Sequence, residues 1–145
     1  MIILDTNVVS ESLKPLPSGI VVGWLADQMQ SEVFTTAITL AEVMSGVEAL
    51  PQGKRRARLL AGVEEIFAQE FPGRILPFEE DAARAYAAIM ASRIAAGRPI
   101  SQFDAMIAAI ARTHRATVAT RNIADFDRCG VQLVDPWKHR GHRPA

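Results

Sequence analysis

The first eleven residues, Met1–Glu11, read MIILDTNVVSE, and they place a carboxylate directly after a short apolar segment. Residues 2–4 form a continuous apolar run with two β-branched isoleucines, which is typical of a strand buried on both faces. Asp5 follows at once, and the polar residues Thr6 and Asn7 come next. Such an aspartate either caps a turn or the next helix, or binds a cation at the end of the strand. The stretch predicts a buried strand and leaves both interpretations of Asp5 open.

Strand-like and helix-like segments alternate along the rest of the chain. Short apolar runs predict further strands at 32–36, 117–120 and 131–134, with an extended piece at 74–78. Helical spacing of apolar residues and helix-favouring composition predict helices at 19–30, 38–50, 54–67, 79–97 and 102–114. This alternation predicts an α/β domain with a central, mostly parallel sheet. Ligands of such sheets bind beyond the carboxyl ends of the strands, where Asp5 and residues 121–125 are expected.

Composition narrows the class of protein. The 145 residues suit one domain, and 49% hydrophobic with 22% charged residues is typical of a globular chain. The formal net charge is +0, so no overall basic character indicates binding to nucleic acid. A single cysteine, Cys129, and the lack of a signal-peptide pattern favour a reducing cytoplasm, and no apolar run is long enough for a membrane helix. We expect residues 1–137 to form the domain and 138–145 to be a basic, mobile tail.

Glu42 is the second candidate carboxylate. It lies in the helix predicted at 38–50, on the side opposite the apolar stripe. An ordinary solvated glutamate is one interpretation. However, its side of the helix carries small residues, Ser45 and Gly46 among them, and these favour a close contact with either a cleft or a second subunit.

Asp104 is the third candidate. Residues Ser101 to Asp104 match a capping box, in which Ser101 caps the helix and Asp104 reaches back to its first residue. Asp104 therefore either caps this helix or serves as a ligand. The apolar stripe of the same helix is expected to be buried, Phe103 included.

The segment TRNIADFDR, residues 120–128, adds oxygen donors just after a predicted strand, namely Thr120, Asn122, Asp125 and Asp127. A turn into a short helix capped by Asn122 would explain them without a function. If the candidate carboxylates converge, however, they repel one another, and they must hold protons, meet basic side chains or bind a cation. Oxygen ligands suit Mg²⁺ or Mn²⁺. Scattered histidines argue against zinc: His114, His139 and His142.

The order and spacing of these motifs resemble the PIN-domain nucleases, and within them the VapC-type toxins of bacterial toxin–antitoxin pairs, most of all the FitB-like branch. The resemblance runs from Met1 to about Trp137 and rests on ILDTNVVSE, VVGWL, AITLAEVMSGV, GRILPF, TVATRNIADF and DPW. It implies a PIN-like three-layer α/β/α domain. It also implies an endoribonuclease that depends on Mg²⁺ or Mn²⁺.

The same resemblance assigns expected roles to individual residues. The acidic quartet of the family falls on Asp5, Glu42, Asp104 and a fourth donor, which is either Asn122 or Asp125. Three neighbouring residues would support these carboxylates: Thr6, Asn7 and Thr120. A metal ion held there would activate water for attack on an RNA phosphodiester. Three cations near the predicted loops are candidates for binding the RNA: Arg121, Arg98 and Lys14.

The resemblance also implies partners. Such toxins form homodimers and are held inactive by a cognate antitoxin of the VapB or FitA kind. The operator DNA is bound only through the antitoxin. No membrane partner is expected.

Two other functions fit parts of the pattern. A phosphotransfer enzyme with Asp5 as nucleophile would need a second aspartate two residues later, and that position is Asn7. A PIN-like module with a decayed site would bind RNA or a protein without cleaving, and the neutral Asn122 supports that reading. Metal-dependent cleavage of RNA, lost in Asp5→Asn, separates these possibilities.

Overall fold

Five parallel strands form one central sheet in residues 1–141, the part of the chain that the computed structural model describes. They are β1 (Ile2–Leu4), β2 (Val33–Thr36), β3 (Ile75–Leu76), β4 (Thr117–Ala119) and β5 (Gln132–Val134). Their order across the sheet is β3-β2-β1-β4-β5. β1 is therefore the central strand, with Ile2 opposite Val33 on one side and Thr117 on the other. The predicted α/β fold with a parallel sheet is confirmed.

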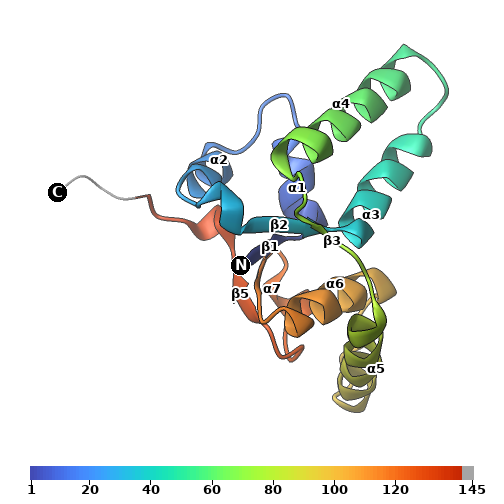
Figure 1. The fold of residues 1–145 in the computed structure, drawn as a ribbon, viewed down its shortest axis with the longest axis vertical. Helices are drawn as coiled ribbons and strands as arrows, with labels where there is room; N and C mark the ends of the chain where they lie inside the picture. Colours follow the sequence, from blue (N-terminus) through green and yellow to red (C-terminus); the bar gives the residue numbers. More distant parts are fainter. Residues whose placement is uncertain (142–145) are drawn as a thin grey trace.

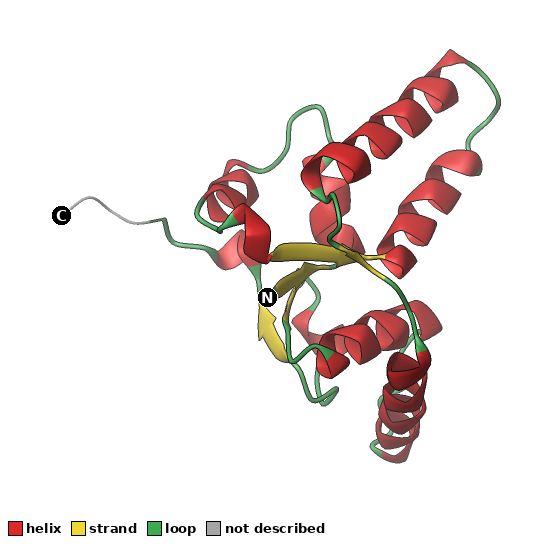
Figure 2. Cartoon of the chain, in the orientation of Figure 1, coloured by secondary structure: helices red, strands yellow, loops and turns green. Residues whose placement is uncertain are grey.

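Helices cover both faces of this sheet (Figures 1 and 2). One layer contains α1 (Thr6–Ser12), α2 (Gly19–Ala26), α3 (Ala37–Glu48) and α4 (Lys54–Glu70). The opposite layer contains α5 (Glu80–Ala95), α6 (Gln102–Thr113) and the short α7 (Ile123–Phe126). Two 3₁₀ turns, η1 (Gln30–Glu32) and η2 (Pro136–Lys138), complete the described elements. This is the three-layer arrangement that the family resemblance implied.

The two faces of the sheet are buried in two separate cores, as the continuous apolar run of β1 predicts. Successive side chains of a strand point to opposite faces. Ile3 accordingly packs in the core beneath α5 and α6, whereas Leu4 packs in the core beneath α1 to α4. Both are almost fully buried, at 0% and 2% exposure. A strand buried on both faces fixes the position of Asp5, the residue at which it ends.

Helix α1 was not predicted from the sequence, because its residues have low intrinsic helix propensity. The structure begins α1 at Thr6, directly after β1. Asp5 is its N-cap, and its carboxylate accepts a hydrogen bond of 3.1 Å from the backbone N–H of Val8. The capping interpretation of Asp5 is therefore correct as local structure, whatever further role the carboxylate has.

The apolar stripe of α6 is buried only from its second turn onward. Ile107 and Ile110 are fully buried, but Phe103, in the first turn, is 49% exposed. The expectation that Phe103 is buried was wrong, because its side chain packs in neither of the two cores.

The end of the chain is described as far as residue 141. Lys138 ends η2, and the imidazole of His139 contacts the Asp27 carboxylate at 2.9 Å. The remainder of the predicted tail, residues 142–145, lies outside the described residues. Over residues 1–141, no helix has both the length and the apolar composition needed to cross a membrane.

Candidate functional site

Asp5 lies at the carboxyl end of the central strand. Its backbone N–H donates to the carbonyl of Ala119 in the neighbouring β4, and its side chain is buried. Burial raises the pKa of Asp5 from 3.8 to about 6. The Thr120 hydroxyl and the N–H of Val8 donate to the carboxylate and lower the pKa, while the charge of Asp104 raises it. Asp5 is thus a desolvated acid held by neutral donors.

Glu42 reaches the same edge from α3, the helix that follows β2. The Thr6 hydroxyl donates to its carboxylate at 2.7 Å, so the first residue of α1 holds a side chain 36 positions away. Burial raises the pKa of Glu42, the Thr6 hydrogen bond lowers it, and the charge of Asp104 raises it. Glu42 and Gly46 line a cavity of about 390 Å³ between α1, α3 and α4, so the small residues beside Glu42 do border a cleft.

Asp104 lies in the first turn of α6, where the Ser101 hydroxyl accepts its backbone N–H at 3.1 Å. Half of the predicted capping box is therefore present. Burial is the largest effect and raises the pKa of Asp104, and the negative charge of Asp125 raises it further. A hydrogen bond with the Ser101 hydroxyl and the positive charge of Arg93 lower this pKa. Asp104 acts on both Asp5 and Glu42 in turn, so it is the carboxylate that connects the cluster electrostatically.

The two candidates for the fourth position lie differently. Asp125 is in α7, and its negative charge raises the pKa of Asp104. Asn122 is the N-cap residue of α7 and makes no side-chain capping bond, while its backbone N–H donates to the Thr120 hydroxyl at 3.0 Å. Asp125 therefore belongs to the interacting carboxylates, and Asn122 lines a neighbouring cleft. Whether Asn122 or Asp125 is the fourth ligand stays a prediction, and of the two Asp125 is the one whose charge acts on the cluster.

Asn7 lies beside this cluster and lines that neighbouring cleft together with Asn122. Its backbone N–H lowers the pKa of Asp5 by hydrogen bonding. The expected supporting residues Thr6, Asn7 and Thr120 are thus each placed next to a candidate carboxylate. Their functional roles stay predictions.

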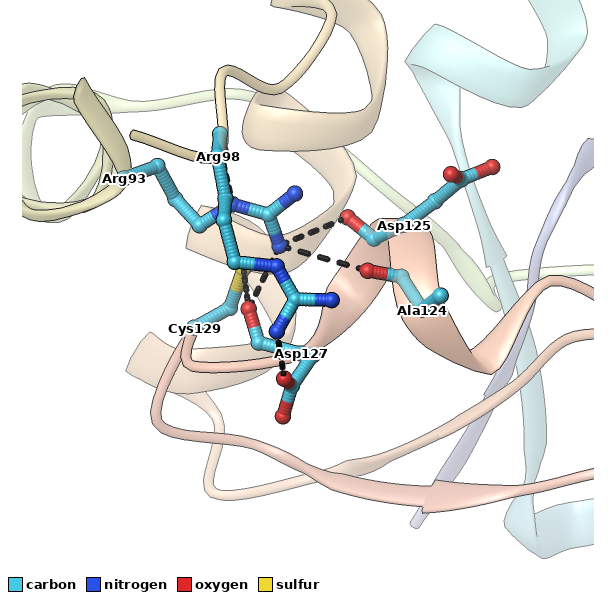
Figure 3. Close-up of polar contacts among 6 residues, drawn as sticks. All are labelled: Arg93, Arg98, Ala124, Asp125, Asp127 and Cys129. Atoms are coloured by element: carbon cyan, nitrogen blue, oxygen red, sulfur yellow. Dashed lines mark hydrogen bonds and ion pairs between the residues drawn. The ribbon is translucent and has the colours of Figure 1, made fainter. Parts of the chain in front are cut away.

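Arg93 is a residue that the sequence analysis missed (Figure 3). It lies near the end of α5 and is only 4% exposed. Its guanidinium donates to the carbonyls of Ala124 at 3.5 Å, Asp125 at 3.2 Å and Asp127 at 2.5 Å, and to that of Arg98 at 2.5 Å. The cation thereby holds the carboxyl end of α7, while the Asp125 carboxylate points away from it. Arg93 fixes the segment that carries Asp125 without neutralising its side chain.

The three cations predicted to bind RNA differ in their partners. Arg98 forms an ion pair of 2.9 Å with Asp127, and Lys14 forms one of 2.7 Å with Glu11. Arg121 instead places its guanidinium over the ring of Trp137, 5.0 Å from the ring centre. The charges of Arg98 and Lys14 are therefore locally balanced by carboxylates, and that of Arg121 is held against an aromatic ring.

The donor set fits a hard cation. It consists of carboxylate, hydroxyl and amide oxygens, which are the ligands of Mg²⁺ and Mn²⁺ rather than of zinc. Within residues 1–141, no three Asp, Glu, His or Cys side chains are close enough to form a ready-made metal cage. Mg²⁺ seldom uses such a cage, because it binds through one or two carboxylates and keeps several waters. The repelling acids at the sheet edge are compatible with that mode of binding.

Comparisons with known proteins agree with this geometry. The PIN domain family model matches residues 2–131. The VapC ribonuclease Y4jK of Sinorhizobium fredii is 41% identical over 138 residues, which cover 95% of this chain and 99% of the relative. Toxin FitB of Neisseria gonorrhoeae is 42% identical over 137 residues, covering 94% and 99%. The solved structure of FitAB bound to an IR36 DNA fragment has a TM-score of 0.88 at 41% identity, covering 99% of this chain and 100% of that chain.

The raised pKa of Asp5 predicts a stability that depends on pH. Because the folded-state pKa lies above the unfolded value, folding takes up a proton between about pH 4 and pH 6. Stability from this group is therefore greatest below about pH 4 and is lost as the pH rises through about 6. Asp5→Asn keeps the helix cap and removes the charge, so it should raise the free energy of unfolding at pH 7 by about 2 kcal/mol.

Chemical denaturation at pH 7 and pH 4, with chelator present, measures this effect. The advantage of the variant should shrink toward pH 4. An Asp5→Asn protein that is no more stable than the wild type at pH 7 would contradict the prediction.

Arg93 predicts a second, structural effect. Arg93→Met should lower the free energy of unfolding by about 3 kcal/mol, because several carbonyls around the buried guanidinium lose a charged donor. Arg93→Lys should recover part of this loss, since it restores the charge without the planar fork. Arg84→Met, on an exposed part of the same helix, is the control and should change stability by less than about 0.5 kcal/mol. Equal effects of the Arg93 and Arg84 substitutions would contradict the proposal that Arg93 holds the α7 segment in place.

Proposed function

The chain belongs to the PIN-domain family, and from that membership we propose that it is the toxin of a type II toxin–antitoxin system and a metal-dependent endoribonuclease. One observation carries the proposal. Asp5, Glu42, Asp104 and Asp125 come from different elements, and the charge of Asp104 raises the pKa of Asp5 and Glu42, while the charge of Asp125 raises the pKa of Asp104. Carboxylates that repel one another, three of them with pKa values raised by burial, are typical of a cation-dependent hydrolase site.

The proposed division of roles follows from the contacts. Asp5 and Asp104 would hold Mg²⁺ or Mn²⁺, with Glu42 and Asp125 completing the site directly or through water. When bound, the ion would neutralise charge on the phosphodiester and lower the pKa of a coordinated water. Thr6 fixes the orientation of the Glu42 carboxylate, and Thr120 does the same for Asp5. The side chains are thus oriented by donors that leave their negative charge available.

The proposed partners rest on the relatives. The structure neighbours include FitAB bound to DNA, and FitB is described as a toxin. We propose that this chain binds a cognate antitoxin of the FitA or VapB kind, and contacts operator DNA only through it. A homodimer is part of the same proposal. The substrate is RNA, as the ribonuclease names of relatives such as Y4jK suggest for those proteins.

The alternative of a decayed site has less support. Its motivation was the neutral Asn122, but Asn122 lines the cleft beside the carboxylates, and Asp125 would supply the fourth acid. The cluster therefore keeps its negative charge without a contribution from position 122.

Cleavage of RNA tests the proposal. The purified chain should cut RNA in Mg²⁺ or Mn²⁺ and lose activity when a chelator is added. Asp5→Asn should reduce the rate by at least about 100-fold, equivalent to roughly 3 kcal/mol of transition-state stabilisation. Because Asp5→Asn is expected to fold more stably than the wild type, unfolding would not explain the loss.

Asp81→Asn is the matched control, since its carboxylate is 88% exposed on α5 and is not among the interacting acids. It should cleave at the wild-type rate. Equal cleavage by Asp5→Asn would refute the catalytic assignment. A chain that binds its antitoxin but cleaves no RNA would favour the decayed site.

A further inference from the structure

A second cleft borders the carboxylate cluster on the other side of α1. It has a volume of about 240 Å³ and is lined by Asn7, Ser10, Glu11, Lys14, Arg121, Asn122 and Trp137. Three α1 residues line this cleft, Asn7, Ser10 and Glu11, and two line the cavity that contains Glu42, Thr6 and Ser10. Ser10 therefore borders both. Two adjacent faces of α1 therefore border the cleft and the cavity. The carboxylate cluster lies at the start of this helix.

The cleft lies next to the proposed catalytic residues. Asn7 is two residues from Asp5, and Asn122 is two residues from Thr120, the donor to Asp5. A single strand of nucleic acid with one phosphate at the carboxylates would therefore place its next nucleotide at this cleft.

Arg121 gives the cleft its chemical character. Within residues 1–141 its guanidinium is in no ion pair, and it is stacked over the ring of Trp137. Trp137 is itself fixed, because its backbone N–H donates to the Asp135 carboxylate at 2.9 Å. A guanidinium held by one face keeps its planar array of N–H donors, which matches the oxygens of a phosphate.

The other charges in the cleft are nearly balanced. Lys14 is paired with Glu11, whose carboxylate also accepts the backbone N–H of Ser18 at 2.9 Å. Arg121 therefore leaves the cleft with a net positive charge. The hydroxyl of Ser10 and the amides of Asn7 and Asn122 add neutral donors and acceptors, which suit ribose hydroxyls or base edges.

We propose that this cleft is a nucleotide subsite, which binds the ribonucleotide next to the cleaved phosphodiester through the Arg121 guanidinium. Trp137 is a positioning residue that keeps Arg121 in place. The proposal deepens the proposed ribonuclease function and rests on it. None of the four proposed catalytic carboxylates lines the cleft, so the subsite contributes to RNA binding and not to the chemical step.

The test uses the full chain carrying Asp5→Asn, so that bound RNA is not cleaved. The probe is a short, fluorescently labelled single-stranded oligoribonucleotide, and its anisotropy gives the affinity. Adding Arg121→Gln should weaken binding by about tenfold and lower the salt dependence of binding by about one phosphate contact. Arg121→Lys should keep the salt dependence but recover only part of the affinity, because it lacks the planar fork.

Arg115→Gln is the matched control. Arg115 is also an exposed arginine beside β4, but it precedes the strand. It therefore lies at the amino end of the parallel strands, whereas Arg121 lies at their carboxyl end. It should bind RNA with the same affinity and salt dependence as the parent. Equal losses in the Arg115 and Arg121 variants would show general charge attraction and overturn the subsite.

Tryptophan fluorescence gives a second readout. Trp24 is buried in the core, so Trp24→Phe leaves Trp137 as the reporter of the cleft. RNA should change the Trp137 emission, and this change should shrink in Arg121→Gln. An unchanged emission at saturating RNA would overturn the proposal.

Kinetics separate the subsite from the proposed function. In the cleaving chain, Arg121→Gln should raise KM about tenfold and change kcat by less than about twofold. If the wild type cleaves and Arg121→Gln has the same KM, the subsite is wrong while the ribonuclease assignment stands. If the wild type cleaves no RNA, the proposed function fails first. If Arg121→Gln binds RNA normally but loses its antitoxin, the cleft belongs to a protein partner and the proposal is overturned.

Discussion

Asp5 ends the central strand, is almost fully buried, and is acted on by the negative charge of Asp104. Burial and like-charge repulsion both disfavour its ionised form. The chain offsets these costs with donors: Thr120 and Val8 for Asp5, and Thr6 for Glu42. These donors stabilise the carboxylates without cancelling their charge. The arrangement thus preserves a negative site that the fold alone does not neutralise, and a bound cation would relieve the repulsion.

The parallel sheet explains how distant residues reach this site. β1 and β2 are neighbours and point the same way, so Asp5 and the start of α3, which carries Glu42, lie at one edge. Helix α1 connects them, because Asp5 caps it and its first residue, Thr6, holds Glu42. The local cap and the candidate site are therefore parts of one structure. Asp5 can therefore both cap helix α1 and serve as a candidate cation ligand.

The sequence predicted the sheet and the elements that carry Asp5, Glu42 and Asp104, because strand and helix periodicities are local, and the family resemblance implied the helix layers. It failed to predict α1, a seven-residue helix of β-branched and polar residues with low intrinsic helix propensity. It also missed Arg93, whose carbonyl partners on α7 lie 31 to 34 positions away. An arginine near the end of a helix is usually solvated or interacts with that helix's own carbonyls. Only the tertiary structure shows that it clamps another helix.

The net charge of zero gave no sign of nucleic-acid binding, and the structure explains why that sum is uninformative. Lys14 and Arg98 are each balanced by a carboxylate, whereas Arg121 is held by the ring of Trp137. A cation supported by an aromatic ring keeps its charge and donors available, while one paired with a carboxylate does not. Arg121 therefore places an available positive charge beside the acidic site, although the chain as a whole is neutral. In this fold, the partner of each cation determines its capacity to bind a phosphate more than the number of cations does.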